Sequence, residues 1–178
     1  MDTDPDVVSH INGGPTAISL PEVDKLIDET DLSLEVVQCG NFKVMKYVAE
    51  KLSSKGQLNR MLMGTDAPSG TGVIPLSQLR TMSYLASCCE GVSAAEAICI
   101  GTGNNAKKFK LNRGLIETGK EADFVIMDAP LGSDGDDALA ALEVGDLPGV
   151  SFVMVDGKVV VKTSRNTPPA TRKPSFEK

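Results

Sequence analysis

The sequence predicts an α/β protein in which parallel βα units are followed by a small separate β unit. Short apolar runs alternate with helix-period segments over residues 1–111, which is the pattern of a parallel sheet. Beyond this point Asp156-Gly157, a two-residue hairpin signal, stands between two β-branched runs. We therefore expect a parallel βα part (1–111), a β part (112–163) and an extended tail (164–178).

In the first part each predicted strand precedes a helix. Ser19 is a suitable cap and Pro21 suits the first turn of the first helix, while Ser93 and Glu96 form a capping box for a later one. The predicted strands are 7–10, 34–38 and 60–65, and the predicted helices are 21–27, 43–54, 75–86, the one opening at Ser93, and 102–109.

The second part reads differently. We expect a strand over 122–128, an acidic loop over 132–137, a helix over 137–144 and hairpin strands over 152–155 and 158–161. The proline-rich segment 167–174 predicts an extended or disordered tail.

Composition excludes several classes of partner. The net charge of −6 and the pI near 4.8 disfavour nucleic acid and anionic membranes. No apolar run approaches the ~20 residues of a membrane span, and the acidic start at Met1–Asp6 is unlike a signal peptide. We expect a cytoplasmic protein whose four cysteines are reduced and mostly buried.

Two strand ends carry candidate site residues. His10, the single histidine, ends one apolar run, and Asp66 ends another before Ala67-Pro68. Carboxyl ends of parallel strands meet at one edge, and histidine and aspartate are ligands that hydrolytic metal sites use. Each type also has a structural interpretation, as a hydrogen-bonded histidine or a turn aspartate.

Small residues follow both candidates. Gly13 and Gly14 follow His10, and Ser69 and Gly70 follow Asp66. These four residues either let a substrate approach backbone N–H groups or simply give the loops conformational freedom, and the sequence leaves both interpretations open.

The order of these motifs resembles the C-terminal part of an amidohydrolase-superfamily enzyme, most closely the enamidases that open cyclic enamides in nicotinate fermentation. GLIETGKEADFVIMD is typical of the superfamily, whereas HINGGPTAIS, DAPSGTG and SRNTPPA are similar to enamidases in particular. The resemblance implies strands six to eight of a (β/α)8 barrel with their helices, plus part of a small β-sandwich. It also implies homo-oligomers of the full-length form.

For the site, the resemblance implies a binuclear divalent metal centre, of zinc or else iron or manganese, with His10 and Asp66 as ligands. Asp66 is then also the catalytic proton carrier. The family's other ligands, a His-x-His pair, a lysine or acid and a further histidine, have no counterpart because His10 is the only histidine. We therefore expect a fragment that is inactive alone.

Three functions remain open at this stage. The chain is part of an enzyme that hydrolyses a small cyclic amide, or part of a dihydroorotase-like or deaminase-like relative. Alternatively, it is a non-catalytic truncated barrel that needs its N-terminal half to fold, since an open slice of a barrel leaves strand edges unpaired.

Overall fold

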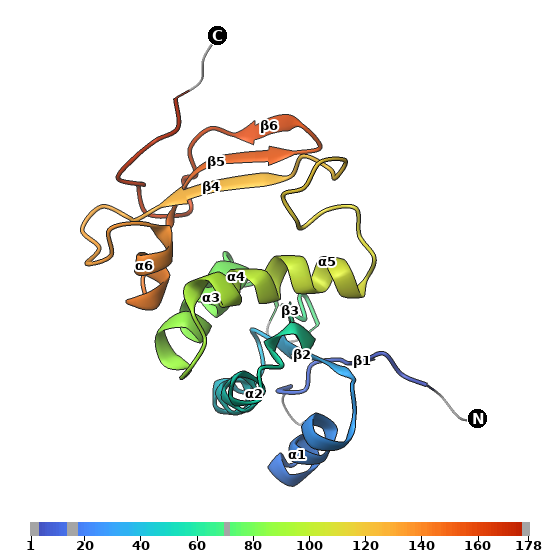
Figure 1. Ribbon diagram of the computed structural model, residues 1–178. Helices are drawn as coiled ribbons and strands as arrows, with labels where there is room; N and C mark the ends of the chain where they lie inside the picture. Colours follow the sequence, from blue (N-terminus) through green and yellow to red (C-terminus); the bar gives the residue numbers. More distant parts are fainter. Residues whose placement is uncertain (1–3, 14–17, 70–71, 176–178) are drawn as a thin grey trace.

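The computed structural model describes residues 4–13, 18–69 and 72–175. The two sheets in these residues have three strands each, one parallel and one antiparallel. Figure 1 shows helices α3, α4 and α5 lying between the two sheets, with α1 and α2 beyond the parallel sheet. None of the helices in the described part has the length and apolar character of a membrane span.

The parallel sheet carries the candidate site. Its strands lie in the order β1-β2-β3 and run in the same direction, so their carboxyl ends meet at one edge. Both crossovers contain a helix, as the alternating pattern predicts. The elements are β1 (Val7–Val8), α1 (Leu20–Glu29), β2 (Ser33–Val37), α2 (Phe42–Ser54), a short 3-10 turn η1 (Leu58–Arg60) and β3 (Met61–Gly64).

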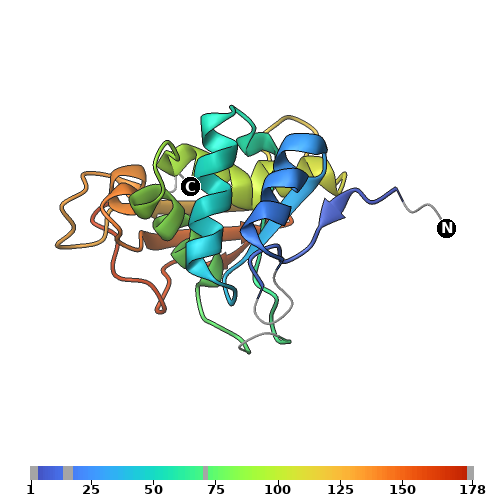
Figure 2. The ribbon, with the colours of Figure 1, turned by 90° about the horizontal axis from the view of Figure 1, so that it is seen from below.

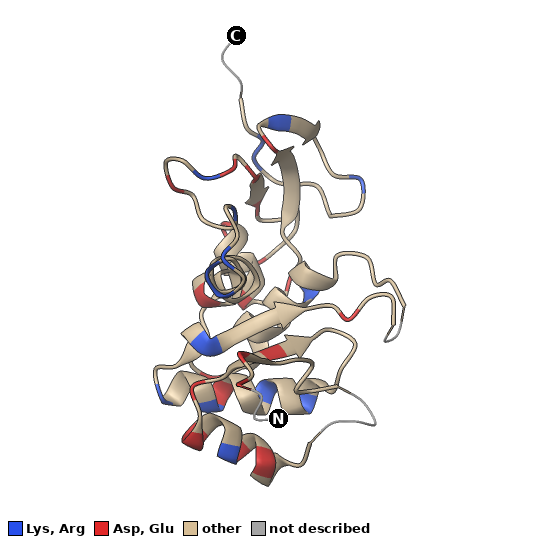
Figure 3. Cartoon of the chain, turned by 90° about the vertical axis from the view of Figure 1, so that its right-hand side faces the viewer, with Lys and Arg blue, Asp and Glu red and all other residues tan. Residues whose placement is uncertain are grey.

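Helices α1 and α2 lie side by side (Figures 1 and 2), and local signals fix where each begins. The Glu22 carboxylate accepts the Ser19 N–H at 2.8 Å, and the Asn41 side chain accepts two N–H groups of the first turn of α2. Figure 3 shows acidic and basic residues intermixed on these helices. Lys51 pairs with Asp24 at 2.6 Å and Asp28 at 3.0 Å, and its hydrogen bond lowers the pKa of the Asp24 carboxyl.

The helical layer between the sheets has one irregular turn. It consists of α3 (Ser77–Cys88), α4 (Ala94–Cys99), the π-helical η2 (Ile100–Asn104) and α5 (Asn105–Lys108). The Ser93–Glu96 capping box forms as expected. The α-helix expected over 102–109 is shorter, because residues 102–104 belong to the π-helical η2. Within η2, Gly101 packs closely against α3, since a Cβ at this position would lie 2.5 Å from Met82 Cε.

The core lies between the parallel sheet and its helices. It is aliphatic and methionine-rich, as the scarcity of aromatic residues implies. Members below 1% exposure include Val23, Leu34, Val36, Met45, Val48, Leu52, Met61 and Leu85. Leu142, which belongs to the second part of the chain, is buried in the same core.

The antiparallel sheet is β4 (Phe124–Asp128), β5 (Gly149–Val155) and β6 (Lys158–Val161), in that order. The Asp156-Gly157 hairpin forms as expected, with both residues in the left-handed region at φ 49° and 69°. Helix α6 (Ala138–Glu143) begins at Asp137, whose side chain accepts two N–H groups of its first turn. The division at residues 111 and 163 stays a prediction.

The tail is extended and is held against this sheet. Thr167 Oγ1 accepts the Val150 N–H at 3.0 Å, and Ala170 bridges to Pro130. Arg172 then clamps Asp128: its Nε and main-chain N–H donate to Oδ2 at 2.8 Å, and Nη2 donates to Oδ1 at 2.5 Å. Of the two conformations that the proline content predicted, extended or disordered, the described residues of the tail adopt the extended one, and these bonds hold them in it.

All four cysteines lie in the described residues and are thiols rather than disulfides, but most of them are not buried. Cys88 and Cys99 are exposed and Cys39 is half-buried. Only Cys89 is buried, and that burial raises the pKa of its thiol to about 11. The expectation of mostly buried thiols was therefore wrong, because the helix positions of Cys88 and Cys99 face outward.

Candidate functional site

His10 and Asp66 both lie at the carboxyl edge of the parallel sheet. His10 comes two residues after β1, and Asp66 comes two residues after β3. Both have left-handed backbones, with φ 39° for His10 and 54° for Asp66. Non-glycine residues seldom adopt this conformation, and such residues cluster at functional sites. The predicted placement at strand ends is thus observed, although each residue belongs to the loop rather than to the strand.

Two side chains hold the Asp66 carboxylate, one on each oxygen. Cys39 Sγ, from the loop after β2, donates to Oδ2 at 3.4 Å. Ser69 Oγ, from the turn after β3, donates to Oδ1 at 3.0 Å. Ser69 therefore contacts the predicted catalytic residue directly. The same contacts restrict the rotation of the carboxylate and so fix the direction in which it presents its lone pairs.

His10 is exposed, and its backbone is fixed by a neighbouring acid and a tight turn. The His10 N–H donates to Glu35 Oε2 at 3.3 Å, and the His10 carbonyl accepts the Gly13 N–H at 2.6 Å. A Cβ on Gly13 would lie 2.8 Å from that carbonyl oxygen and 3.1 Å from His10 Nδ1. Gly13 is therefore needed for the His10 turn, a role distinct from the substrate approach considered above.

A buried asparagine joins these loops. Asn12 Oδ1 accepts the Val37 N–H at 2.8 Å, and its Nδ2 donates to the Val37 carbonyl at 3.0 Å. The Asn12 carbonyl also accepts the Asn41 N–H at 2.6 Å. Fully buried and bonded to the end of β2, Asn12 fixes the loop two residues beyond His10.

The described residues do not complete a metal site. Imidazole and carboxylate are suitable donors, but no group of three or more histidine, cysteine, aspartate or glutamate side chains gathers anywhere in the described ranges. Zinc sites use three or four protein ligands. His10 and Asp66 are thus at most part of a ligand set. Gly14 and Gly70 lie outside the described residues.

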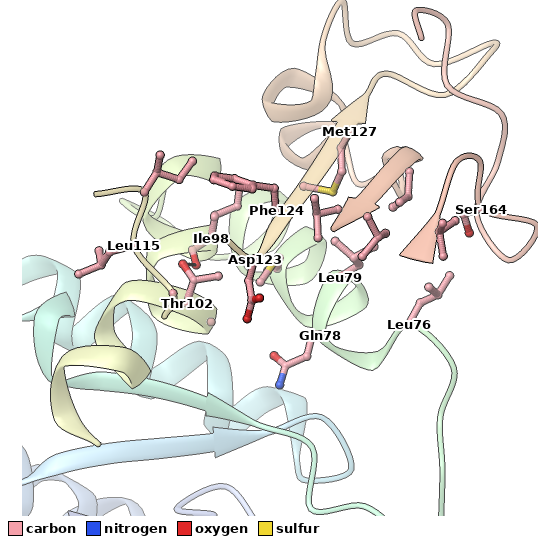
Figure 4. A pocket seen from close by; sticks show the side chains of 18 residues that line it. Leu76, Gln78, Leu79, Ile98, Thr102, Leu115, Asp123, Phe124, Met127 and Ser164 are labelled. Carbon is pink, nitrogen blue, oxygen red and sulfur yellow. Dashed lines mark hydrogen bonds between the residues drawn. The ribbon is translucent and has the colours of Figure 1, made fainter. Parts of the chain in front are cut away.

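An apolar cleft of about 570 Å³ lies elsewhere, between the helical layer and the antiparallel sheet (Figure 4). Leu79, Ile98, Phe124 and Met127 line it, with Asp123 among its few polar members. It contains none of the strand-end residues, so we do not regard it as the reaction site.

A sequence model of the amidohydrolase family matches residues 23–160, which is most of the chain. The chain belongs to the amidohydrolase family. An amidohydrolase named enamidase, from Eubacterium barkeri, is 56% identical over 170 residues, covering 96% of this chain and 44% of the relative. The chain therefore spans less than half the length of this relative.

Two solved structures are similar to the chain. The crystal structure of enamidase superposes with a TM-score of 0.92 at 56% identity, over 96% of this chain and 44% of that chain. The expected α/β fold, as part of an amidohydrolase structure, is therefore confirmed. β-Aspartyl dipeptidase from Fervidobacterium islandicum AW-1 matches with a TM-score of 0.62 at 17% identity, over 95% of this chain and 40% of that one. This second likeness concerns the fold alone.

The residues that sequence reasoning missed are Asn12, Glu35 and Cys39. Asn12 lies inside the HINGGPTAIS motif, so that motif marked its segment, whereas Glu35 lies in the predicted strand 34–38 and Cys39 directly follows it. Their side-chain contacts, however, join residues 25 to 27 positions apart, and no local pattern indicates such pairs.

Proposed function

We propose that this chain is the C-terminal part of a metal-dependent amidohydrolase that hydrolyses the C–N bond of a small cyclic amide, with an enamide as the substrate class. The similarity to enamidase over nearly the whole chain supports the reaction class. The observation that carries it is the placement of His10 and Asp66, both left-handed, after parallel strands at one sheet edge.

In this proposal the chain supplies the proton carrier of the reaction. Asp66 accepts a proton as the oxygen of water bonds to the amide carbonyl carbon, and returns it to the nitrogen as the C–N bond breaks. Cys39 and Ser69 hold the two carboxylate oxygens during this exchange. Because His10 and Asp66 alone are too few to hold a metal, the remaining ligands come from outside this chain.

A non-catalytic role is the second candidate, and the short donor set favours it. Under that hypothesis the 178-residue chain is a truncated barrel that needs its N-terminal half to fold and that binds neither metal nor substrate. Substitution of Asp66 in a protein that contains the remaining ligands separates the two readings.

The test uses a fusion protein in which the portion of Eubacterium barkeri enamidase that this chain does not match precedes the chain. Ring opening of a cyclic enamide is followed with zinc supplied. We expect turnover by the fusion protein, none by the chain alone, and a loss of at least ~10²-fold in kcat for Asp66→Asn, which keeps the shape but removes the proton acceptor.

Asp134→Asn is the matched control, because Asp134 is an exposed loop aspartate of the second part of the chain. It should leave kcat unchanged. Near-normal kcat for Asp66→Asn, or substantial turnover by the chain alone, would contradict the assignment of Asp66.

A further inference from the structure

The outer edge of β3 has no unsatisfied backbone groups, although β3 pairs with β2 alone among the described strands. Gly64 faces β2, since its carbonyl accepts the Gln38 N–H. Met61 and Met63 therefore face the opposite edge, because alternate residues of a strand direct their N–H and C=O groups to the same side. The N–H and carbonyl groups of Met61 and Met63 therefore need hydrogen-bond partners at this edge.

All four have partners other than a strand. The Met61 N–H donates to the Leu58 carbonyl, and the Met61 carbonyl accepts Asn104 Nδ2 at 3.0 Å. The Met63 N–H donates to Asn105 Oδ1 at 3.3 Å, and the Met63 carbonyl accepts Asn105 Nδ2 at 2.9 Å. The two asparagine side chains thus provide three of the four bonds along this edge.

The geometry at Asn105 is repeated elsewhere in the molecule. Asn12 forms the same two bonds with the N–H and carbonyl of Val37 on β2. A side-chain amide presents one donor and one acceptor side by side, as a neighbouring peptide group does. It can therefore replace one residue of an adjacent strand.

We infer that Asn104 and Asn105 take the place of a neighbouring strand at Met61 and Met63 and close this part of the β3 edge to strand pairing. The strand that leads to Asp66 is then anchored by the helical segment that follows it in the chain. A longer protein that contains this chain makes no main-chain ladder at Met61 and Met63. This inference is independent of the proposed reaction.

Amide hydrogen exchange in the 178-residue chain tests this inference, with NMR resolving single N–H groups. Asn105→Ala should speed exchange of the Met63 amide at least about fivefold, the factor for one ordinary hydrogen bond, and leave the Val37 amide unchanged. Asn12→Ala is the matched control, and it should speed exchange of the Val37 amide and leave the Met63 amide unchanged. Unchanged exchange at Met63 in Asn105→Ala overturns the inference.

Asn105→Asp covers the case in which the alanine variant unfolds. It keeps an acceptor for the Met63 N–H, so retained protection of that amide supports the inference and lost protection overturns it. A second experiment introduces Asn105→Ala into the fusion protein and measures amide exchange by mass spectrometry on a peptide that spans residues 60–64. If Met63 stays protected there in Asn105→Ala, a strand has replaced the asparagine and the inference is wrong.

Discussion

At the scale of single residues, the backbones of His10 and Asp66 carry strain that other contacts must offset. A non-glycine residue in the left-handed region costs about 1–2 kcal/mol. Both residues have positive φ, and side chains hold each of them: Glu35 of β2 for His10, and Cys39 from the loop after β2 with Ser69 of the same turn for Asp66. The structure therefore holds two residues in an unfavourable left-handed conformation at one edge of the sheet. This is expected at a functional site, where the direction of the His10 and Asp66 side chains matters more than stability.

Gly13 provides the first prediction at this scale. Gly13→Ala should destabilise the chain by about 1–3 kcal/mol, because the new Cβ meets the fixed carbonyl of His10. Urea unfolding measures the loss. Gly103→Ala is the control and should cost little, since its nearest neighbour is the movable end of Leu115. Equal stability of the two variants would show that the His10 turn opens freely.

Sequence reasoning reached some of these residues and not others, for a physical reason. His10 and Asp66 are recognisable because each interrupts an apolar run with a polar residue followed by small ones. Ser69 was found for its position, although its contact with Asp66 was not anticipated. Asn12 and Cys39 act through contacts that only the folded chain creates, so their types and spacing give no signal.

At the scale of elements, the ion pair between Asp128 and Arg172 is one of the contacts that hold the tail against the antiparallel sheet. Asp128 is almost fully buried, and Arg172 contacts both of its oxygens. These hydrogen bonds hold the pKa of the Asp128 carboxyl well below its usual range. A carboxyl with a lowered folded-state pKa stabilises the fold above its unfolded pKa and loses that contribution as pH falls through the folded pKa.

Arg172→Gln should therefore lower the urea midpoint at pH 7, and the difference from the unsubstituted chain should shrink as pH falls below about 4. The main-chain N–H of Arg172 still donates to Asp128 in the variant, so the tail should loosen rather than detach. Arg165→Gln, an exposed arginine of the same segment, is the control. If the difference in urea midpoint between Arg172→Gln and the unsubstituted chain stayed constant from pH 7 to pH 2, this explanation would be wrong.

Local signals predicted most elements. Capping residues and the Asp156-Gly157 turn depend on neighbours within three residues, so the beginnings of α1 and α4 and the hairpin followed from the sequence. The π-helical turn of η2 was missed, because it depends on how closely Gly101 approaches Met82 on another helix. The contacts that hold the extended tail were missed for the same reason, since its partners lie on β4 and β5.

At the scale of the whole molecule, the antiparallel sheet leaves apolar side chains in solvent on both of its faces. Val125 and Ile126 are 53% and 41% exposed, and Val159 and Val160 are 46% and 56% exposed. Consecutive strand residues point to opposite faces, so neither face is fully covered here. Exposed apolar surface of this kind indicates a protein–protein contact.

The isolated chain should consequently bind a hydrophobic dye such as ANS and elute at larger apparent size as its concentration rises. Fusion to the unmatched portion of enamidase should reduce both effects, and Val160→Thr in the isolated chain should reduce dye binding in part. Dye binding that is equal for the chain and the fusion protein would show that this surface stays uncovered.

Helix α6 limits which segments can be exchanged between amidohydrolases to make hybrid proteins. It comes from the second part of the chain, yet its Leu142 is buried in the core that α3 and α4 share with the parallel sheet. A hybrid that took residues 112–163 from another relative would import a foreign side chain into that core. Grafts should therefore keep α6 with its own α3 and α4 and join the foreign β4, β5 and β6 around it, and the flanking loops at 132–137 and 145–148 are the natural junctions.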